Sequence, residues 1–338
     1  MRGNLIVSAA LLVMLVSCAN RTNTVPRAIA VFVPGVLEGS PSYQMMDSGV
    51  RLAADTAGVE VKTIEGGFDQ AAWLSQLMSL ASENQYGLIV TSNPAMSEVC
   101  TQVSSAYADQ DFLVLDGSGL VGDSVSDVVY EHREQAFLVG YFAGLVTTSH
   151  ELDRANSDLK VGMIAGQEYP QMIREIQPGF EIGLHTVNPD IELEFKVLGN
   201  WYDAEKAREY AMSLYDEGVD VILTIAGGAN QGVISAARES EGYVLWFDSE
   251  GSHMAPGIVL AGAIIRQEDA AKEWVDKWIN NDLNMGESRR VGVSDGYVDF
   301  PTESQLFKKH VPDSIQKQMR EIVSQMKSGS LSLRSLDG

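Results

Sequence analysis

The residues best suited to chemistry in this sequence stand directly after short apolar runs, where a loop or helix begins. They are hydroxyl, aromatic, amide, carboxylate and guanidinium side chains and two glycines: Ser42, Tyr43, Gln44, Asn93, Asp116, Trp201, Gly227, Gly228, Asp248 and Arg266. Amides and carboxylates bind hydroxyl groups, aromatic rings stack on flat molecules, and a guanidinium donates two parallel hydrogen bonds to a polar edge. Together these groups predict a binding site for a flat, hydroxylated ligand.

The signatures of common enzyme classes are absent from the sequence. It contains no GxxxxGK[ST] loop, no GxSxG elbow, no HExxH and no CxxC. The five histidines, His132, His150, His185, His253 and His310, are scattered without the spacing of metal ligands. We therefore predict no catalytic residue, no metal site and no resident cofactor.

Several candidates also have a purely structural explanation. The amides of the glycine-rich segment 227–232 could face a polar ligand edge, or its glycines could serve only a tight turn. Asp116 could cap a local turn, and Asp203 is interpreted as a helix cap. Trp201 and its neighbour Tyr202 could belong to the core, although an adjacent aromatic pair in a loop favours a stacking clamp. Arg266 could pair only with a nearby acidic residue.

Short apolar runs alternate with helical patterns from residue 28 onward, which is typical of βαβ units with buried parallel strands. The runs are Ala28–Val33, Glu60–Thr63, Tyr86–Thr91, Phe112–Leu115, Val128–Tyr130, Lys160–Ile164, Glu192–Val197, Val219–Ile225, Tyr243–Phe247 and Val259–Ile264. These are too many strands for one modest sheet, and polar residues interrupt the pattern near 147–159. The predicted fold is α/β, with two doubly wound parallel-sheet lobes joined by a hinge. Ligands of such sheets bind beyond the carboxyl ends of the strands, where the candidate residues stand.

The domain boundaries follow from this break. We expect a first lobe over residues 28–147, completed by part of 265–310, a second lobe over 148–264, and a C-terminal helix and tail over 311–338. The chain of 338 residues is long enough for two domains. Its net charge of -22 argues against nucleic acid as a partner, because such a surface repels phosphate.

The N-terminus has the pattern of an export signal. Residues 1–17 contain one cation and an apolar run that is too short to span a bilayer, and residues 18–27 are interpreted as a tether. Leu15-Val16-Ser17-Cys18 resembles the lipobox of bacterial lipoproteins, in which the Cys18 thiol receives a diacylglycerol. An ordinary signal peptide with a chance cysteine is the alternative. The lipobox predicts a protein anchored by lipid to a bacterial cell membrane.

Several blocks in the same order carry a resemblance to a known family. They are 111–117 (DFLVLDG), 134–140 (EQAFLVG), 160–166 (KVGMIAG), 187–189 (VNP) and 215–222 (YDEGVDVI) running into 226–228 (AGG). These blocks resemble the basic membrane protein family, lipoproteins typified by the purine nucleoside receptor of ABC transporters. The resemblance covers most of the chain and implies the type I periplasmic-binding fold and an ABC permease as partner.

The family's binding motifs are only partly kept. Its Asp-Lys-Ser-Phe-Asn-Gln loop corresponds to residues 39–44 (GSPSYQ), which retain the Gln and lose the acid. Its Phe-Asn-Asp block corresponds to 201–203 (WYD), its nucleoside-binding aspartate to Asp248, and its Lys to Arg266 or a neighbour. With its larger ring clamp and one acid fewer, this site resembles the riboflavin-transporting subgroup of the family.

The resemblance therefore implies a substrate-binding lipoprotein that captures riboflavin between two lobes, with no chemistry performed. A purine nucleoside is the alternative ligand. A nucleoside-processing enzyme with Asp248 or Asp116 as general base, and a ligand-free surface adhesin or antigen, are alternatives from other classes.

Overall fold

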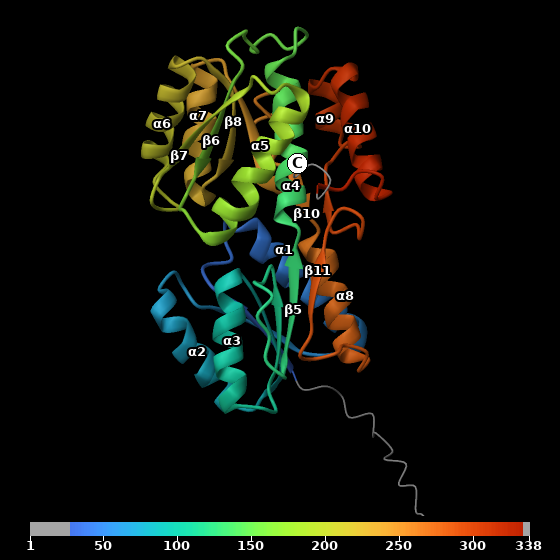
Figure 1. Ribbon diagram of the computed structural model, residues 1–338. Helices are drawn as coiled ribbons and strands as arrows, with labels where there is room; N and C mark the ends of the chain where they lie inside the picture. The colour runs from blue at the N-terminus through green and yellow to red at the C-terminus, as the bar shows by residue number, and fades with distance from the viewer. Residues whose placement is uncertain (1–27, 334–338) are drawn as a thin grey trace, which may run out of the picture.

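The computed structural model describes residues 28–333, which form two lobes, each built on a six-stranded sheet (Figure 1). The first sheet has the strand order β11-β5-β4-β3-β1-β2, and the second has the order β12-β10-β9-β8-β6-β7. All neighbours run parallel except β12, which pairs antiparallel with β10. The predicted α/β fold with two doubly wound lobes is confirmed.

The first lobe contains β1 (Ala28–Val33), α1 (Pro41–Ala57), β2 (Val61–Glu65), α2 (Gln70–Ser82), β3 (Tyr86–Ser92), α3 (Pro94–Ala106), β4 (Asp111–Leu115), β5 (Val125–Tyr130), α8 (Gln267–Ile279) and β11 (Ser288–Val291). Successive side chains along each strand point to opposite faces of the sheet, and each face is covered by a different pair of helices. Val31 and Val90 pack with the layer that contains α1 and α8, whereas Phe32 and Ile89 pack with α2 and α3.

The second lobe contains α4 (His132–Thr147), β6 (Lys160–Ala165), a π-helical turn (Met172–Ile176) that continues into α5 (Gln177–Val187), β7 (Glu192–Val197), α6 (Ala204–Asp216), β8 (Val219–Ile225), α7 (Asn230–Glu239), β9 (Tyr243–Asp248), β10 (Val259–Ile265), β12 (Val298–Asp299), α9 (Gln305–His310) and α10 (Asp313–Lys327). Short 3-10 turns lie at Gly227–Ala229 and Ser252–Met254. Ile222 and Val244 pack with α6 and α7, while Leu223 and Leu245 join the layer of α4 and α5.

The structure moves the lobe boundary predicted at residue 147. Helix α4 is buried over most of its length and packs on α5, α10 and the second sheet, so the chain changes lobe at Glu131, directly after β5. The polar stretch near 147–159 is the loop between α4 and β6 inside the second lobe. The polar composition near 147–159 therefore reflects a loop and not a lobe boundary. The boundary falls between a buried strand, β5, and a buried helix, α4.

The chain crosses between the lobes at three places in the described residues: from β5 to α4, from β10 to α8, and from β11 to β12 (Figure 1). As expected, part of 265–310 completes the first lobe, through α8 and β11. Strand β12 and α9 return to the second lobe, and α10 packs there as well. Strands β11 and β12 were not predicted, because β11 is polar and exposed and β12 is only 2 residues long.

No helix within residues 28–333 has both the length and the apolar character needed to cross a bilayer. The predicted signal segment 1–17, the tether 18–27 and the end of the predicted tail lie outside the described residues.

Candidate functional site

Three predicted site residues stand at strand carboxyl ends with left-handed backbone. Asn93 follows β3, Asp116 follows β4 and Asp248 ends β9, with φ of 117°, 53° and 67° respectively. Residues other than glycine rarely adopt such φ values, and each residue held there costs on the order of 1–3 kcal/mol of stability. Strained backbone that a fold tolerates tends to be found where ligands bind. The strain therefore coincides with positions that the sequence singled out for binding.

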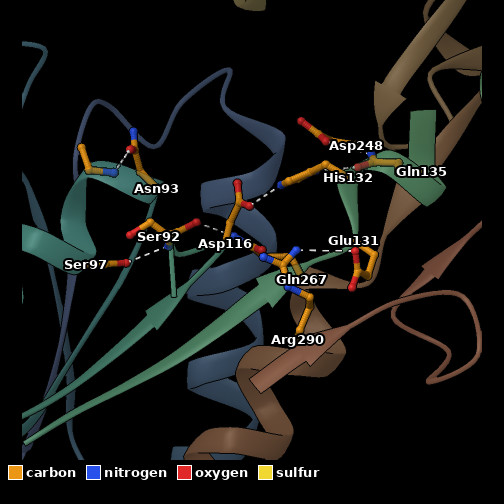
Figure 2. A network of polar contacts seen from close by, with 12 residues as sticks. Ser92, Asn93, Ser97, Asp116, Glu131, His132, Gln135, Asp248, Gln267 and Arg290 are labelled. Atoms are coloured by element: carbon orange, nitrogen blue, oxygen red, sulfur yellow. Dashed lines mark hydrogen bonds and ion pairs between the residues drawn. The ribbon is translucent and has the colours of Figure 1, made fainter. Parts of the chain in front are cut away.

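A chain of hydrogen bonds connects the two lobes through α4 (Figure 2). His132 Nε2 lies 2.6 Å from Asp116 Oδ1, and His132 Nδ1 lies 2.9 Å from Gln135 Oε1. Gln135 Nε2 donates to Asp248 Oδ1 at 3.0 Å. We call these four residues the hinge network, because His132 is the first helical residue after the crossing from β5.

The hinge network favours a charged imidazole. Gln135 donates with its amide nitrogen, so its oxygen accepts from His132 Nδ1–H, while Asp116 accepts from Nε2–H. Burial lowers the pKa of His132, but the carboxylates of Asp116 and Asp248 and the two hydrogen bonds outweigh it, and the pKa rises to about 9. Burial raises the pKa of Asp248, which His132 and Gln135 partly oppose. The hydrogen bonds to Asp116 and Gln135 thus favour the protonated imidazole of His132 at neutral pH.

Tyr43, at the start of α1, lies beside the polar residues of the first lobe. Its hydroxyl donates to Pro34 O at 3.3 Å. Burial raises the pKa of Tyr43 to about 12; a hydrogen bond with Asn93 opposes this and the Asp116 carboxylate adds to it. Asn93 Oδ1 also caps α3 by accepting from Ala95 N at 2.9 Å. Tyr43, Asn93 and Asp116 are therefore brought together by β1, β3 and β4.

Ser42 and Gln44, from the predicted binding loop 39–44, make no hydrogen bond with the other candidate residues within residues 28–333. Ser42 lies in the first turn of α1 and is half-buried, whereas the Gln44 side chain is exposed. Their participation in a ligand site remains a prediction.

In the second lobe, the rings of Tyr169 and Trp201 lie together, and we call them the aromatic wall. The Trp201 and Tyr169 ring centroids are 6.1 Å apart at 45°. Burial, then the carboxylates of Asp248 and Asp116, raise the pKa of the Tyr169 hydroxyl. Tyr169 thus links the aromatic wall to the hinge network.

The predicted glycines lie under this wall. A Cβ on Gly227 would approach Trp201 O to 3.1 Å, and its φ of 57° suits glycine. The φ of Gly227 fits the tight-turn explanation, and a ligand contact of Gly227 or Gly228, which are both exposed, stays a prediction. Asp203 is confirmed as a cap, since its side chain accepts from Lys206 N at 3.0 Å.

Arg266, directly after β10, is engaged by acidic side chains. Its guanidinium pairs with Asp299 at 3.1 Å and with Asp269 at 3.6 Å. Pairing with an acidic residue, the alternative considered above, describes its position in this structure.

Comparison with known proteins defines the family. Residues 27–332 match the model of the ABC transporter substrate-binding protein PnrA-like family. The chain belongs to this family. It is 22% identical over 276 residues to basic membrane protein D of Borreliella burgdorferi strain JD1, covering 80% of this chain and 77% of that protein. It is 28% identical over 292 residues to basic membrane protein B of Borreliella afzelii strain PKo, covering 80% and 79%.

Solved structures support the same fold. An ABC transporter solute-binding protein from Aeropyrum pernix K1 superposes with a TM-score of 0.78 at 18% identity, covering 91% of this chain and 93% of that one. A second, from Conexibacter woesei DSM 14684, gives 0.70 at 16%, covering 90% and 98%. Membership of this substrate-binding family implies a small-molecule ligand and an ABC permease as partner.

Three residues of this site were missed by the sequence reasoning. His132 and Gln135 begin the helical pattern after Val128–Tyr130, and they stand three positions apart, on one face of a helix. That spacing directly after a strand was the available signal. Tyr169 stands in the loop after β6, and the rule that ligands bind beyond strand carboxyl ends was the signal that could have found it.

Proposed function

We propose that this substrate-binding protein captures riboflavin, a flat three-ring molecule with a hydroxylated chain, between its two lobes. The observation that carries the proposal is a separation of chemistry along the sheets. Asp116 follows β4 and Asp248 ends β9, and these strands neighbour the crossing strands β5 and β10, so we call this the hinge side. Tyr43, Tyr169 and Trp201 follow β1, β6 and β7, at the other end of the strand order, which we call the outer side.

A ligand that matches this separation has a polyol at one end and a ring system at the other. The carboxylates of the hinge side can accept hydrogen bonds from hydroxyl groups, since each carboxylate offers about four acceptor positions. The rings of the outer side offer stacking surface. Burial of apolar ring area contributes ~25 cal/mol per Å², so a three-ring plane gains a few kcal/mol over a smaller one.

A purine nucleoside is the second candidate, because the same two carboxylates suit a ribose diol. Gly39, however, stands where nucleoside receptors of this family are expected to carry an acid, so one partner of the diol is missing. An unpaired buried hydroxyl costs about 1–3 kcal/mol. This difference favours riboflavin.

The direct test uses the ligand that the cells supply. Protein purified from cell extract is denatured, and the released small molecules are identified by mass spectrometry. Riboflavin is then titrated into the emptied protein, where we expect quenched flavin fluorescence and little competition from guanosine or inosine. Displacement of flavin by equimolar purine nucleoside, or no heat of flavin binding in a calorimeter, would return the assignment to the nucleoside.

The lipid anchor is a separate proposal, since Cys18 lies outside the described residues. Cys18→Ser should leave the chain unprocessed or released from the membrane. Unchanged detergent partitioning of this variant would refute the anchor.

A further inference from the structure

Gln135 lies at the centre of the hinge network, and both ends of its side-chain amide are used. The residue is fully buried. Its Nε2 donates to Asp248 Oδ1 at 3.0 Å and to Ala263 O at 3.3 Å, and its Oε1 lies 2.9 Å from His132 Nδ1 (Figure 2). Gln135 therefore connects α4 to the ends of β9 and β10 in the second lobe.

The orientation of this amide is decided by Ala263. A backbone carbonyl oxygen can only accept a hydrogen bond, so the amide nitrogen of Gln135 must face Ala263 O. The amide oxygen then faces His132 Nδ1, which must carry a proton in order to donate. Gln135 thus excludes the tautomer of His132 in which Nδ1 accepts, and Nε2 of the same ring interacts with Asp116 at 2.6 Å.

The hinge network occupies one oxygen of each carboxylate and leaves the other. Asp116 uses Oδ1 for His132 and Asp248 uses Oδ1 for Gln135, whereas Oδ2 of each has no hydrogen-bond partner within residues 28–333. Asp116 belongs to the first lobe and Asp248 to the second. A carboxylate held by one oxygen presents the other in a fixed direction, so a ligand hydroxyl spends less binding energy on ordering the site.

We propose that Gln135 is a positioning residue that fixes the orientation of the two ligand-binding carboxylates across the lobes. Its amide nitrogen holds Asp248 directly, and its amide oxygen holds Asp116 through His132. This inference rests on the proposed function, because it takes Asp116 and Asp248 as the acceptors of the ligand hydroxyls. It deepens that function by assigning part of the affinity to a residue with no surface of its own for the ligand.

The titratable groups that face the His132 ring come from three strands. They are Asp116 after β4, Asp248 at the end of β9, and Tyr130 at the end of β5, whose ring centroid lies 6.3 Å from the imidazole. Phe247 stacks on the imidazole at 6.5 Å and carries no charge. Gln135 is the uncharged partner, so Gln135→Met removes its hydrogen bonds without removing any charge from the site.

The first test needs no ligand and follows the His132 ring by NMR as pH is varied. The pKa of His132 should be about 9 in the wild type, and the signal missing from His132→Leu assigns the resonance. Gln135→Met loses an acceptor for the charged ring, so the pKa should fall. Gln135→Glu keeps an acceptor and adds negative charge, so the pKa should rise. Opposite shifts support the proposal, and shifts in one direction, or none, would overturn it.

The second test measures riboflavin binding. Gln135→Met should weaken it about tenfold, because a hydrogen bond to a charged group is lost. The matched control is Gln316→Met in α10, where a buried amide nitrogen donates to Val311 O at 2.7 Å. The control should change neither riboflavin affinity nor the His132 titration. Unchanged affinity in Gln135→Met, or an equal loss in the control, would contradict a positioning role.

The two tests fail separately. If the wild-type protein binds no riboflavin, the riboflavin assignment fails, and the His132 titration still decides whether Gln135 fixes the hinge network. If a purine nucleoside proves to be the ligand, the same variants are titrated with it, and the tenfold loss in Gln135→Met is expected again.

Discussion

The hinge side and the outer side of the site use their side chains in opposite ways. On the hinge side, Asp116, His132, Gln135 and Asp248 are bonded to one another across the two lobes. On the outer side, Phe68 after β2 and Tyr202 after β7 are 72% and 81% exposed. The bonded hinge network contributes mainly to stability, and its remaining acceptor positions are the ones proposed to bind the polyol, whereas the aromatic rings of the outer side are proposed to contribute to binding. Substitutions in the two regions should therefore separate stability from affinity.

The largest effect is expected from His132→Leu, which removes the cation that pairs with Asp116. Breaking a buried ion pair costs about 3–5 kcal/mol, because the remaining charge has no partner. Urea unfolding should show a loss of this size, and His253→Leu, at an exposed position, should show little. Equal losses of unfolding free energy for the two variants would show that the hinge network does not stabilise the fold.

The pH dependence of stability should report the same network. The pKa of His132 is raised from 6.5 to about 9, so the proton stabilises the folded state. This stabilisation is fully present below pH 6.5 and is lost as pH rises through 9. At about 1.4 kcal/mol per pKa unit, roughly 3 kcal/mol should disappear over that window. The wild-type curve minus the His132→Leu curve isolates the effect, and a flat difference would contradict it.

On the outer side, Trp201→Ala should reduce riboflavin affinity by roughly 1–3 kcal/mol, as buried aromatic anchors do. Thermal stability should fall less than in His132→Leu, because Trp201 is only partly buried. Trp201→Phe is the matched control and should keep most of the affinity. A lower melting temperature with unchanged affinity would identify Trp201 as a core residue.

The smallest effect on ligand affinity is expected at a buried carboxylate away from both regions. Asp220, at the amino end of β8, accepts from Thr147 and Asn156, but its Oδ1 has no hydrogen-bond partner in the described part of the chain. Burial raises its pKa to about 6, so stability falls as pH rises from 3.8 through 6. Asp220→Asn should remove this pH dependence, which at about 1.4 kcal/mol per pKa unit amounts to roughly 3 kcal/mol between pH 4 and pH 8 in thermal unfolding. Ligand affinity should not change; a loss of affinity would break the separation of regions.

Periodicity and local chemistry in the sequence determined much of this protein. Ten strands were predicted from short apolar runs and are present in the structure, because buried parallel strands leave a continuous apolar signal. The positions of Asn93, Asp116 and Asp248 also followed from strand ends, which depend only on where an apolar run stops. The cap at Asp203 was readable for the same reason, since it acts on the backbone three residues away.

Only the tertiary structure decided how these elements combine. Helix α4 reads as an ordinary helix in the sequence, and its packing on the second sheet moves the lobe boundary from 147 to 131. His132 and Arg266 show the same limit. The nearest acid to Arg266 in space is Asp299, 33 positions away, and His132 meets Asp116 and, through Gln135, Asp248. Such contacts depend on which strand ends lie side by side, and strand order is set by long-range packing that local sequence patterns do not encode.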